Sequence, residues 1–196
     1  IGSGKNWTKL HHMSSTEYLN YEGGKFSKSR GTGVFGSDAR ESGIPADIWR
    51  FYIFYNRPEK TDAQFTWKDF QEKMNSELIG NLGNLVNRTL TFVSRYYDGT
   101  IPSCDGRLSN REDIKAIAMN LADEHSSSIT RITELMEGAS LRDAFREIFA
   151  LSSLGNKAFQ DGEPWKNRTE DPLRAEALLH DLCYLIRDLA IMIHPF

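Results

Sequence analysis

The chain has 196 residues, of which 39% are hydrophobic and 26% are charged, and its net charge is -3 at pH 7. This length suffices for one large domain or two small ones, and the composition is that of a soluble globular protein. No run of about 20 apolar residues suggests a membrane span, and no segment resembles a signal peptide. The slight negative charge gives no general signal for polyanion binding, so any contact with a nucleic acid has to be local.

Three features of the chain bear on its origin and compartment. It begins at Ile1 rather than at an initiator Met, which predicts a piece of a longer protein. Cys104 and Cys183 are far apart and match no metal-binding spacing, so we expect two free thiols in a reducing compartment, and hence a cytoplasmic protein. His11 and His12 are adjacent and have no third ligand at a useful spacing, so no tightly bound metal is expected.

Short apolar patches between Gly, Asn and Ser residues make up the first part of the chain. Residues 16–21 alternate in polarity as a strand does, residues 22–24 resemble a turn, and residues 25–26 are expected to begin the return strand. Residues 37–57 are interpreted as a connector followed by a helix, and residues 59–65 as a linker. The pattern predicts a small α+β segment.

A long helix is predicted next. Thr66 and Asp69 resemble a capping box, although Asp replaces the usual Glu. Apolar residues then recur at steps of three, four or seven as far as Tyr96, which predicts one helix of about eight turns. Gly80 and Gly83 each weaken such a helix by about 1 kcal/mol relative to Ala, so we expect close packing or a bend there.

Three more amphipathic helices follow along the chain. A capping box at residues 109–112 opens the first, Ser140 opens the second and Pro172 opens the third. Short connections between long amphipathic helices imply antiparallel neighbours. The predicted fold class is therefore mainly α: an antiparallel helix bundle over residues 61–196, preceded by a small α+β segment over residues 1–60.

The most informative stretch is residues 25–31, which read Lys-Phe-Ser-Lys-Ser-Arg-Gly. The ammonium groups of Lys25 and Lys28, the hydroxyl groups of Ser27 and Ser29, and several nearby glycines describe a mobile cationic loop that suits the binding of phosphates. For an arbitrary pair of lysines at this spacing, a solvated basic turn is the alternative.

Four positions in the helical part carry side chains that a bundle does not require. Asn81, Asn84 and Arg88 fall at i, i+3 and i+7, which predicts one face turned away from the apolar stripe. Amide and guanidinium groups suit contacts with bases, but exposed helix faces are ordinarily polar. Trp165 lies between helices, where its ring either packs onto the bundle or stands outward as a platform for a base. The residues alone leave both alternatives open.

The stretch at residues 25–31 resembles the Lys-Met-Ser-Lys-Ser-Arg-Gly loop of class I aminoacyl-tRNA synthetases, with Phe26 where that family usually has Met. Residues 65–70, 81–88 and 164–165 follow it in the same order as in the methionyl-tRNA synthetases, so nearly the whole chain resembles that family. The segments on either side of the loop resemble its cytosolic eukaryotic branch.

This resemblance implies a domain organisation and an activity. Residues 1–60 would be the end of a Rossmann catalytic domain with a stem-contact region, and residues 61–196 a helical anticodon-binding domain. The parent enzyme would activate methionine with ATP and Mg²⁺ and transfer it to tRNA(Met), which has the CAU anticodon. The His-Ile-Gly-His signature and the methionine pocket lie upstream in the family, so this chain alone is expected to be inactive. No residue indicates a partner in a multi-synthetase complex.

The resemblance also implies roles for single residues. Lys28 would stabilise phosphate charge while methionine attacks ATP, and Lys25, Ser27 and Ser29 would shape and close the loop. The residues that would read the CAU anticodon are Asn84, Arg88, Trp165 and, on a weaker match, Asn81. Two alternatives stay open: another class I aminoacyl-tRNA synthetase, and a non-catalytic helical RNA-binding or adaptor module.

Overall fold

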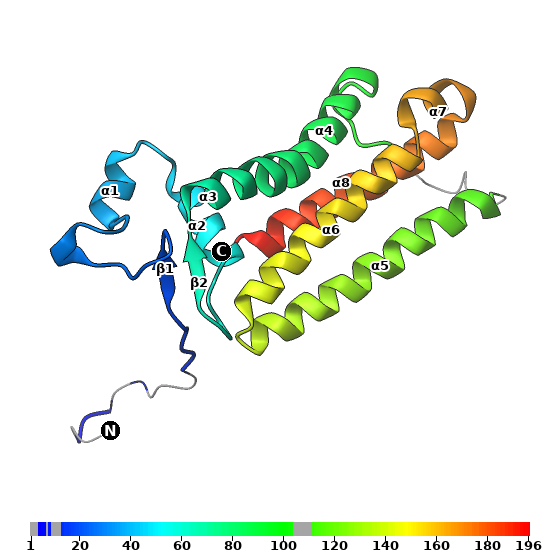
Figure 1. Cartoon of the computed structure of the whole chain (residues 1–196). Coiled ribbons are helices and arrows are strands. Elements are labelled where there is room, and N and C mark those ends of the chain that lie inside the picture. The colour runs from blue at the N-terminus through cyan, green and yellow to red at the C-terminus, as the bar shows by residue number, and fades with distance from the viewer. Residues whose placement is uncertain (1–3, 7, 9–12, 104–110) are drawn as a thin grey trace.

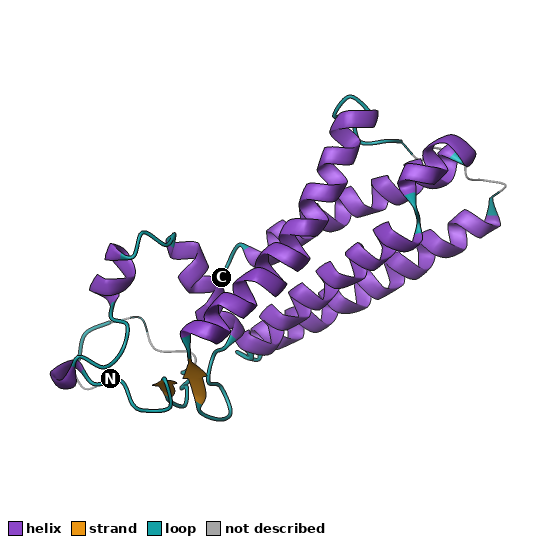
Figure 2. Ribbon diagram, turned by 45° about the horizontal axis from the view of Figure 1, so that its top comes forward, coloured by secondary structure: helices purple, strands orange, loops and turns teal. Residues whose placement is uncertain are grey.

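The computed structural model describes residues 4–6, 8, 13–103 and 111–196 (Figure 1). In chain order, the elements are β1 (Leu19–Tyr21), the 3-10 turn η1 (Lys28–Arg30), α1 (Gly36–Glu41), α2 (Ala46–Tyr55), β2 (Ala63–Phe65), α3 (Trp67–Lys73), the π-helix η2 (Met74–Gly83), α4 (Asn84–Tyr96), α5 (Glu112–Glu137), α6 (Leu141–Asp161), α7 (Pro164–Glu170) and α8 (Pro172–Ile193). Helices dominate, and a small part with two short strands precedes a long bundle (Figure 2). The predicted fold class is confirmed.

The small N-terminal part contains a parallel strand pair that was not expected. β1 pairs with β2, and Tyr21 lies opposite Phe65. The predicted return strand at residues 25–26 is wrong, because the turn at residues 22–24 closes only a single bridge between Tyr21 and Gly24. The true partner strand lies in the segment that was interpreted as a linker, where three residues are too few to show a period.

α2 ties this small part to the start of the long helix. Its residues Phe51 and Tyr52 are only 4% and 0% exposed. The Tyr52 hydroxyl donates a hydrogen bond to Asp69 Oδ2 at 2.7 Å. Burial and then this carboxylate raise the pKa of Tyr52 well above its ordinary value, so the hydroxyl stays a donor. Thr66 Oγ1 accepts the Asp69 N–H at 3.1 Å, so the Thr66 half of the predicted capping box is confirmed, while the Asp69 carboxylate accepts from Tyr52 instead.

The predicted long helix is present over residues 67–96, but its middle third winds as the π-helix η2. A Cβ on Gly80 would lie 2.8 Å from the Asn75 backbone oxygen, and one on Gly83 would lie 3.1 Å from that of Leu78. In both cases the oxygen belongs to the residue five positions earlier, which is the acceptor in a π-helix. The expected close packing at the two glycines is therefore packing against the helix's own backbone.

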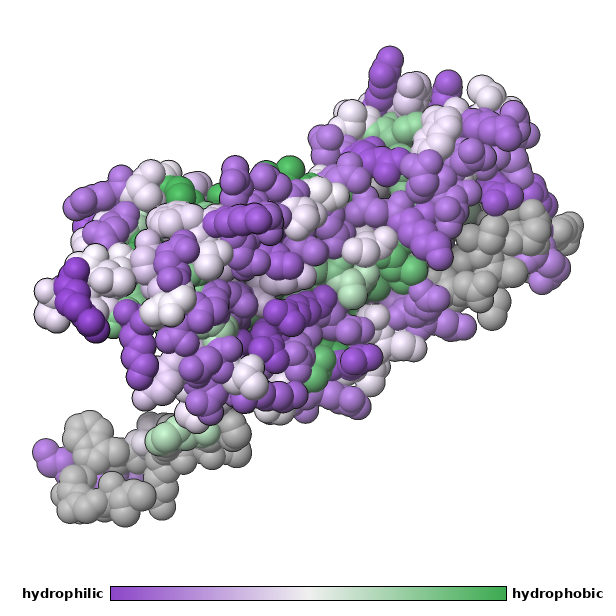
Figure 3. Space-filling model, viewed as in Figure 1, coloured by the Kyte–Doolittle hydropathy of each residue, from purple (hydrophilic) through white to green (hydrophobic). Residues whose placement is uncertain are grey.

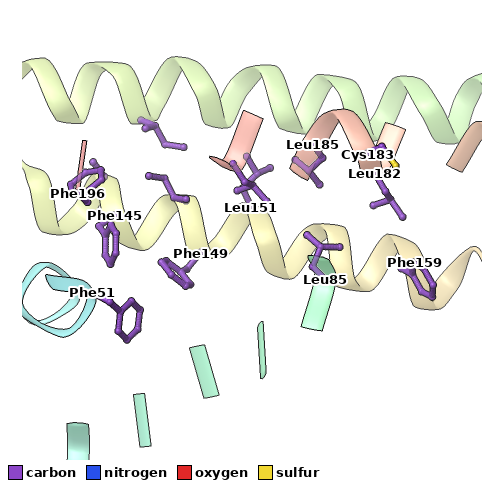
Figure 4. Packing of buried hydrophobic residues seen from close by; sticks show 14 of the residues in the cluster. Phe51, Leu85, Phe145, Phe149, Leu151, Phe159, Leu182, Cys183, Leu185 and Phe196 are labelled. Atoms are coloured by element: carbon purple, nitrogen blue, oxygen red, sulfur yellow. The ribbon is translucent and has the colours of Figure 1, made fainter. Parts of the chain in front are cut away.

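α4, α5, α6 and α8 form the bundle, in which α6 contacts the other three (Figures 1 and 2). Figure 4 shows side chains from α4, α6 and α8 meeting in its core, among them Leu85, Phe145, Leu182 and Leu185. Other buried members of this core are Ile148, Leu179 and Leu189. Gly138 and Gly162 follow the ends of α5 and α6, as glycines commonly do. The predicted capping box at residues 109–112 lies outside the described residues except for its last two positions.

Two short helices, α1 and α7, were not predicted. α1 has six residues and lies in the presumed connector, where the Phe35 N–H donates to Asp38 Oδ2 at 2.9 Å near its start. α7 has seven residues and begins with Pro164, whose missing N–H is no loss at a first helical position. Both are too short to show a hydrophobic period.

The surface seen in Figure 3 is mainly hydrophilic, with apolar side chains between the polar ones. Within the part of the chain that the structure describes, no helix has the length and apolar character needed to cross a membrane.

The π winding makes a prediction about Gly80. Gly80→Ala should lower the free energy of unfolding by about 1–3 kcal/mol, because the new Cβ meets a backbone oxygen that has little freedom to move. Helix propensity alone would favour Ala by about 1 kcal/mol. Denaturant unfolding measures the difference. Ser94→Ala, at an exposed position of α4, is the control and should leave stability unchanged or slightly higher. A similar gain in stability from both substitutions would contradict the π-helix explanation.

Candidate functional site

The lysine-containing loop at residues 25–31 has a defined backbone. The Ser27 N–H donates to the Thr32 oxygen at 2.8 Å, and the Thr32 N–H donates back at 3.0 Å. Between them lies η1, followed by Gly31 in the left-handed region with φ of 63°. The loop is therefore a short closed turn that projects η1 from the N-terminal part.

Phe26 anchors this loop to the small part. The centroid of its ring lies 5.4 Å from that of Tyr21 and 6.3 Å from that of Phe35. The chain returns across this ring at Gly33, where φ is 136° and an added Cβ would overlap Phe26 Cδ1. The loop is thus held to the small part by an apolar side chain. This side chain stands at the sequence position where the class I synthetase loop usually has Met.

The polar groups of the loop remain available. Lys25, Lys28 and Ser29 are exposed, and Ser27 is half-buried. Arg30 Nε donates to Ser27 Oγ at 3.2 Å, and the Oγ atoms of Ser27 and Ser29 lie 3.4 Å apart. Among the described residues, neither lysine forms an ion pair with a carboxylate. Ammonium groups without a carboxylate partner are suited to binding an anion such as phosphate.

A second candidate surface lies where α4, α6 and α7 meet, at the opposite end of the molecule from α1 (Figure 1). We call this concave surface the distal platform, and its lining residues are Asn87, Arg88, Thr91, Phe92, Arg95, Tyr96, Phe159 and Trp165. It combines guanidinium groups with aromatic rings. A positive groove with exposed rings is the arrangement that single-stranded nucleic acids favour.

Arg88 and Trp165 are brought together on the distal platform by one buried ring, that of Phe159. The Trp165 ring is tilted against Phe159 at 6.1 Å and is still 44% exposed, so it is neither core nor fully outward. The Arg88 guanidinium lies 4.4 Å from the centroid of the same Phe159 ring, and its Nη2 donates to Gln160 Oε1 at 3.0 Å. A charged group and a partly open aromatic face therefore line the same concave surface around one ring.

Asn81 and Asn84 do not face away from the bundle, so their predicted orientation is wrong. Asn81 Nδ2 donates to the Phe149 oxygen at 2.8 Å, and Asn84 Nδ2 donates to Asn156 Oδ1 at 2.9 Å. Both partners belong to α6. The prediction assumed ordinary α-helical winding, but the π-helix η2 rotates the face on which these residues lie.

Tyr96 and its cationic neighbours were not predicted as part of a site. The Tyr96 ring is 40% exposed, and guanidinium carbons lie near it, that of Arg95 at 5.3 Å and that of Arg168 at 4.4 Å from its centroid. Arg95 follows Arg88 at i+7, so helical spacing was a usable signal for it. No such signal existed for Arg168, because α7 itself was not predicted.

The sequence also led us to expect no tightly bound metal and two free cysteine thiols. Among the residues that the structure describes, no group of three or more His, Cys, Asp or Glu side chains is arranged to hold a metal ion. Cys183 is a free, buried thiol, and burial raises its pKa. Cys104, His11 and His12 lie outside the described residues.

Comparisons with known proteins identify both parts of the chain. A family model for class I tRNA synthetases (M) matches residues 1–90, and one for the anticodon-binding domain of methionyl-tRNA ligase matches residues 110–196. The chain belongs to the methionyl-tRNA synthetase family. This membership decides against the alternative of another class I synthetase. The domain boundary expected between residues 60 and 61 stays a prediction.

The relatives show how much of a methionyl-tRNA synthetase this chain represents. The methionine–tRNA ligase of Treponema denticola is 71% identical over all 196 residues, which are 25% of that protein, and that of Treponema pallidum is 61% identical over 24% of its length. The chain thus spans about a quarter of the curated relatives that it matches. Both relatives come from Treponema. The resemblance of the segments beside the loop to the cytosolic eukaryotic branch therefore does not indicate which organism the chain comes from.

A solved structure supports the fold. Mycobacterium tuberculosis methionyl-tRNA synthetase in complex with methionyl-adenylate superposes with a TM-score of 0.79 at 23% sequence identity. The match covers 92% of this chain and 35% of that chain. At this identity the likeness concerns the fold alone, and it extends over both the small part and the bundle.

The contact between Gly33 and Phe26 makes a prediction about the loop. Gly33→Ala should displace the loop from its anchor, because a side chain at φ of 136° is strained by about 1–3 kcal/mol and overlaps the ring. Limited trypsin digestion with mass spectrometry should then show faster cleavage after Lys28 and Arg30. Gly36→Ala, whose Cβ would meet no heavy atom within 4 Å, is the matched control and should resemble the parent chain. Equal cleavage rates in all three chains would refute the anchoring role of Phe26.

Proposed function

We propose that the whole protein is a methionine–tRNA ligase, which activates methionine with ATP and Mg²⁺, transfers it to tRNA(Met) and acts in the cytoplasm. Family membership supports this proposal, since the matching family models describe a class I synthetase and a methionyl-tRNA ligase anticodon-binding domain. The related Mycobacterium tuberculosis protein was solved with methionyl-adenylate, the compound formed from methionine and ATP. The part of the enzyme described here would supply an ATP-phosphate loop and an anticodon-binding surface.

In this proposal the loop at residues 25–31 binds the phosphates of ATP. Lys28 stabilises the charge that develops on the phosphates while methionine attacks the α-phosphate and pyrophosphate leaves. Lys25, Ser27 and Ser29 shape the loop and close it over the phosphates, and Mg²⁺ enters with ATP. The exposure of Lys25 and Lys28 and their lack of carboxylate partners among the described residues support these roles.

The distal platform binds the CAU anticodon of tRNA(Met) in this proposal. A base stacked on an aromatic side chain contributes about 1–3 kcal/mol, and the partly open Trp165 ring offers such a face beside the Arg88 guanidinium. Asn84 precedes Arg88 by one turn of α4, so it adjoins the platform, and Asn156 joins it to Asn81. The observation that carries the proposal is that Arg88 and Trp165, which are far apart in sequence, share the Phe159 ring.

A binding experiment with RNA tests this proposal. The chain should bind a labelled CAU anticodon stem-loop more tightly than a stem-loop with a changed first anticodon base, at both low and physiological salt. Trp165→Ala should weaken the binding of the CAU stem-loop by roughly 5- to 150-fold, because one stacked base is lost. Fluorescence anisotropy of the labelled stem-loops measures these affinities.

Trp67→Ala is the matched control for this experiment. Trp67 is 42% exposed, close to the 44% exposure of Trp165. It lies at the start of α3, the end of the long helical run that is remote from the distal platform. Its removal should leave the affinity unchanged. Salt has to be varied because contacts to phosphates alone lose affinity steeply as salt rises. If both stem-loops bind equally and salt-sensitively, and Trp165→Ala changes nothing, the platform does not read the anticodon.

A further inference from the structure

Three asparagines join the long helical run to α6, and backbone carbonyls fix the orientation of their amides. Asn81 Nδ2 donates to the Phe149 oxygen at 2.8 Å. Asn156 Nδ2 donates to the Asn81 backbone oxygen at 2.9 Å, with longer contacts to Asn81 Oδ1 at 3.2 Å and to the Ser152 oxygen at 3.3 Å. A carbonyl oxygen only accepts hydrogen bonds, so the nitrogen end of each of these two amides is determined.

This arrangement leaves Asn84 with one favourable orientation. Because Asn156 turns its nitrogen toward Asn81, its Oδ1 faces Asn84, and Asn84 Nδ2 donates to that oxygen at 2.9 Å. The reversed Asn84 amide would place two oxygens against each other. The network is half-buried, where hydrogen bonds are stronger than in water and an unsatisfied group is costly. The orientation of Asn84 is therefore set from α6.

The outward group of Asn84 is then its oxygen. Asn84 Oδ1 accepts no hydrogen bond from the described residues, and it is not among the buried side-chain atoms that lack a partner. It is consequently not fully buried, and it lies one helical turn before Arg88. Asn84 presents a hydrogen-bond acceptor rather than a donor to anything that binds there.

We propose that Asn156 is a positioning residue, which holds Asn84 with its acceptor oxygen outward and so makes it selective for cytosine at the first anticodon position. This inference rests on the proposed function. Cytosine carries an N4 amino donor where uracil carries an O4 acceptor. An outward Oδ1 therefore accepts a hydrogen bond from cytosine and opposes the oxygen of uracil. Asn156 itself makes no contact with RNA and acts only through Asn84.

The test compares CAU and UAU anticodon stem-loops in matched binding assays. The parent chain should bind the CAU stem-loop more tightly than the UAU stem-loop. In Asn156→Ala the ratio of these two affinities should fall about tenfold, because the released Asn84 amide can turn either way. Asn156→Asp keeps an acceptor for Asn84 Nδ2 but sets a carboxylate against the Asn81 oxygen. We expect this variant to retain the preference for CAU while its unfolding midpoint falls, which separates the orienting role from general stability.

Leu154→Ala is the control for an unspecific loss of packing. Leu154 is a half-buried residue of α6 that packs against the core and lines a hollow shared with Asp123 and Ser127 of α5. Its removal should lower stability and leave the CAU/UAU ratio as in the parent. An unchanged ratio in Asn156→Ala, or an equal loss in Leu154→Ala, would overturn the positioning role. If the parent chain binds both stem-loops equally, the proposed function itself fails, and this inference fails with it.

Discussion

Gly155 of α6 lies so close to two leucine side chains that an added Cβ would stand 2.8 Å from Leu85 Cδ2 and from Leu185 Cδ2. This close approach joins α4, α6 and α8, and the asparagine network lies along the same contact between α4 and α6. The packing sets the position of the long helix and thereby brings Arg88 beside Trp165. The distal platform is thus a consequence of how helices that are distant in sequence pack together, and no single helix contains it.

The two candidate sites are held apart by one continuous helical run over residues 67–96. An α-helix of this length spans roughly 45 Å, and the π-helical middle third makes this run somewhat shorter. Its start is fixed to the small part, because the Trp67 N–H donates to Glu22 Oε1 at 3.0 Å and Trp67 Nε1 donates to the Tyr21 hydroxyl at 3.2 Å. The loop at residues 25–31 begins three residues after Glu22, so the loop and the start of the helical run are attached to the same place in the small part. In the proposed function, this spacing separates the loop that binds ATP from the surface that binds the anticodon.

The sequence predicted the helices that are long enough to show a hydrophobic period, namely α2, the long helical run, α5, α6 and α8, and it also predicted the strand that contains β1. It missed β2, α1 and α7, which are too short for one. Asn81 and Asn84 were assigned to the wrong face, because the glycines at positions 80 and 83 permit a π winding that no regular helical pattern includes. Whether the Trp165 ring packs onto the bundle or stands outward could not be predicted, because its ring partner Phe159 comes from another helix. The roles of the loop lysines came from the family resemblance and not from their spacing.

Hydrogen–deuterium exchange of the backbone amides, with and without a CAU stem-loop, is the most direct measurement of where RNA binds. If the distal platform is the binding surface, exchange should slow in residues 84–96 and 159–168, which contain Arg88 and Trp165. Residues 25–33 should exchange at the same rate in both samples. Slower exchange confined to residues 25–33, with none at the platform, would show that the RNA contacts the basic loop and that the anticodon assignment is wrong.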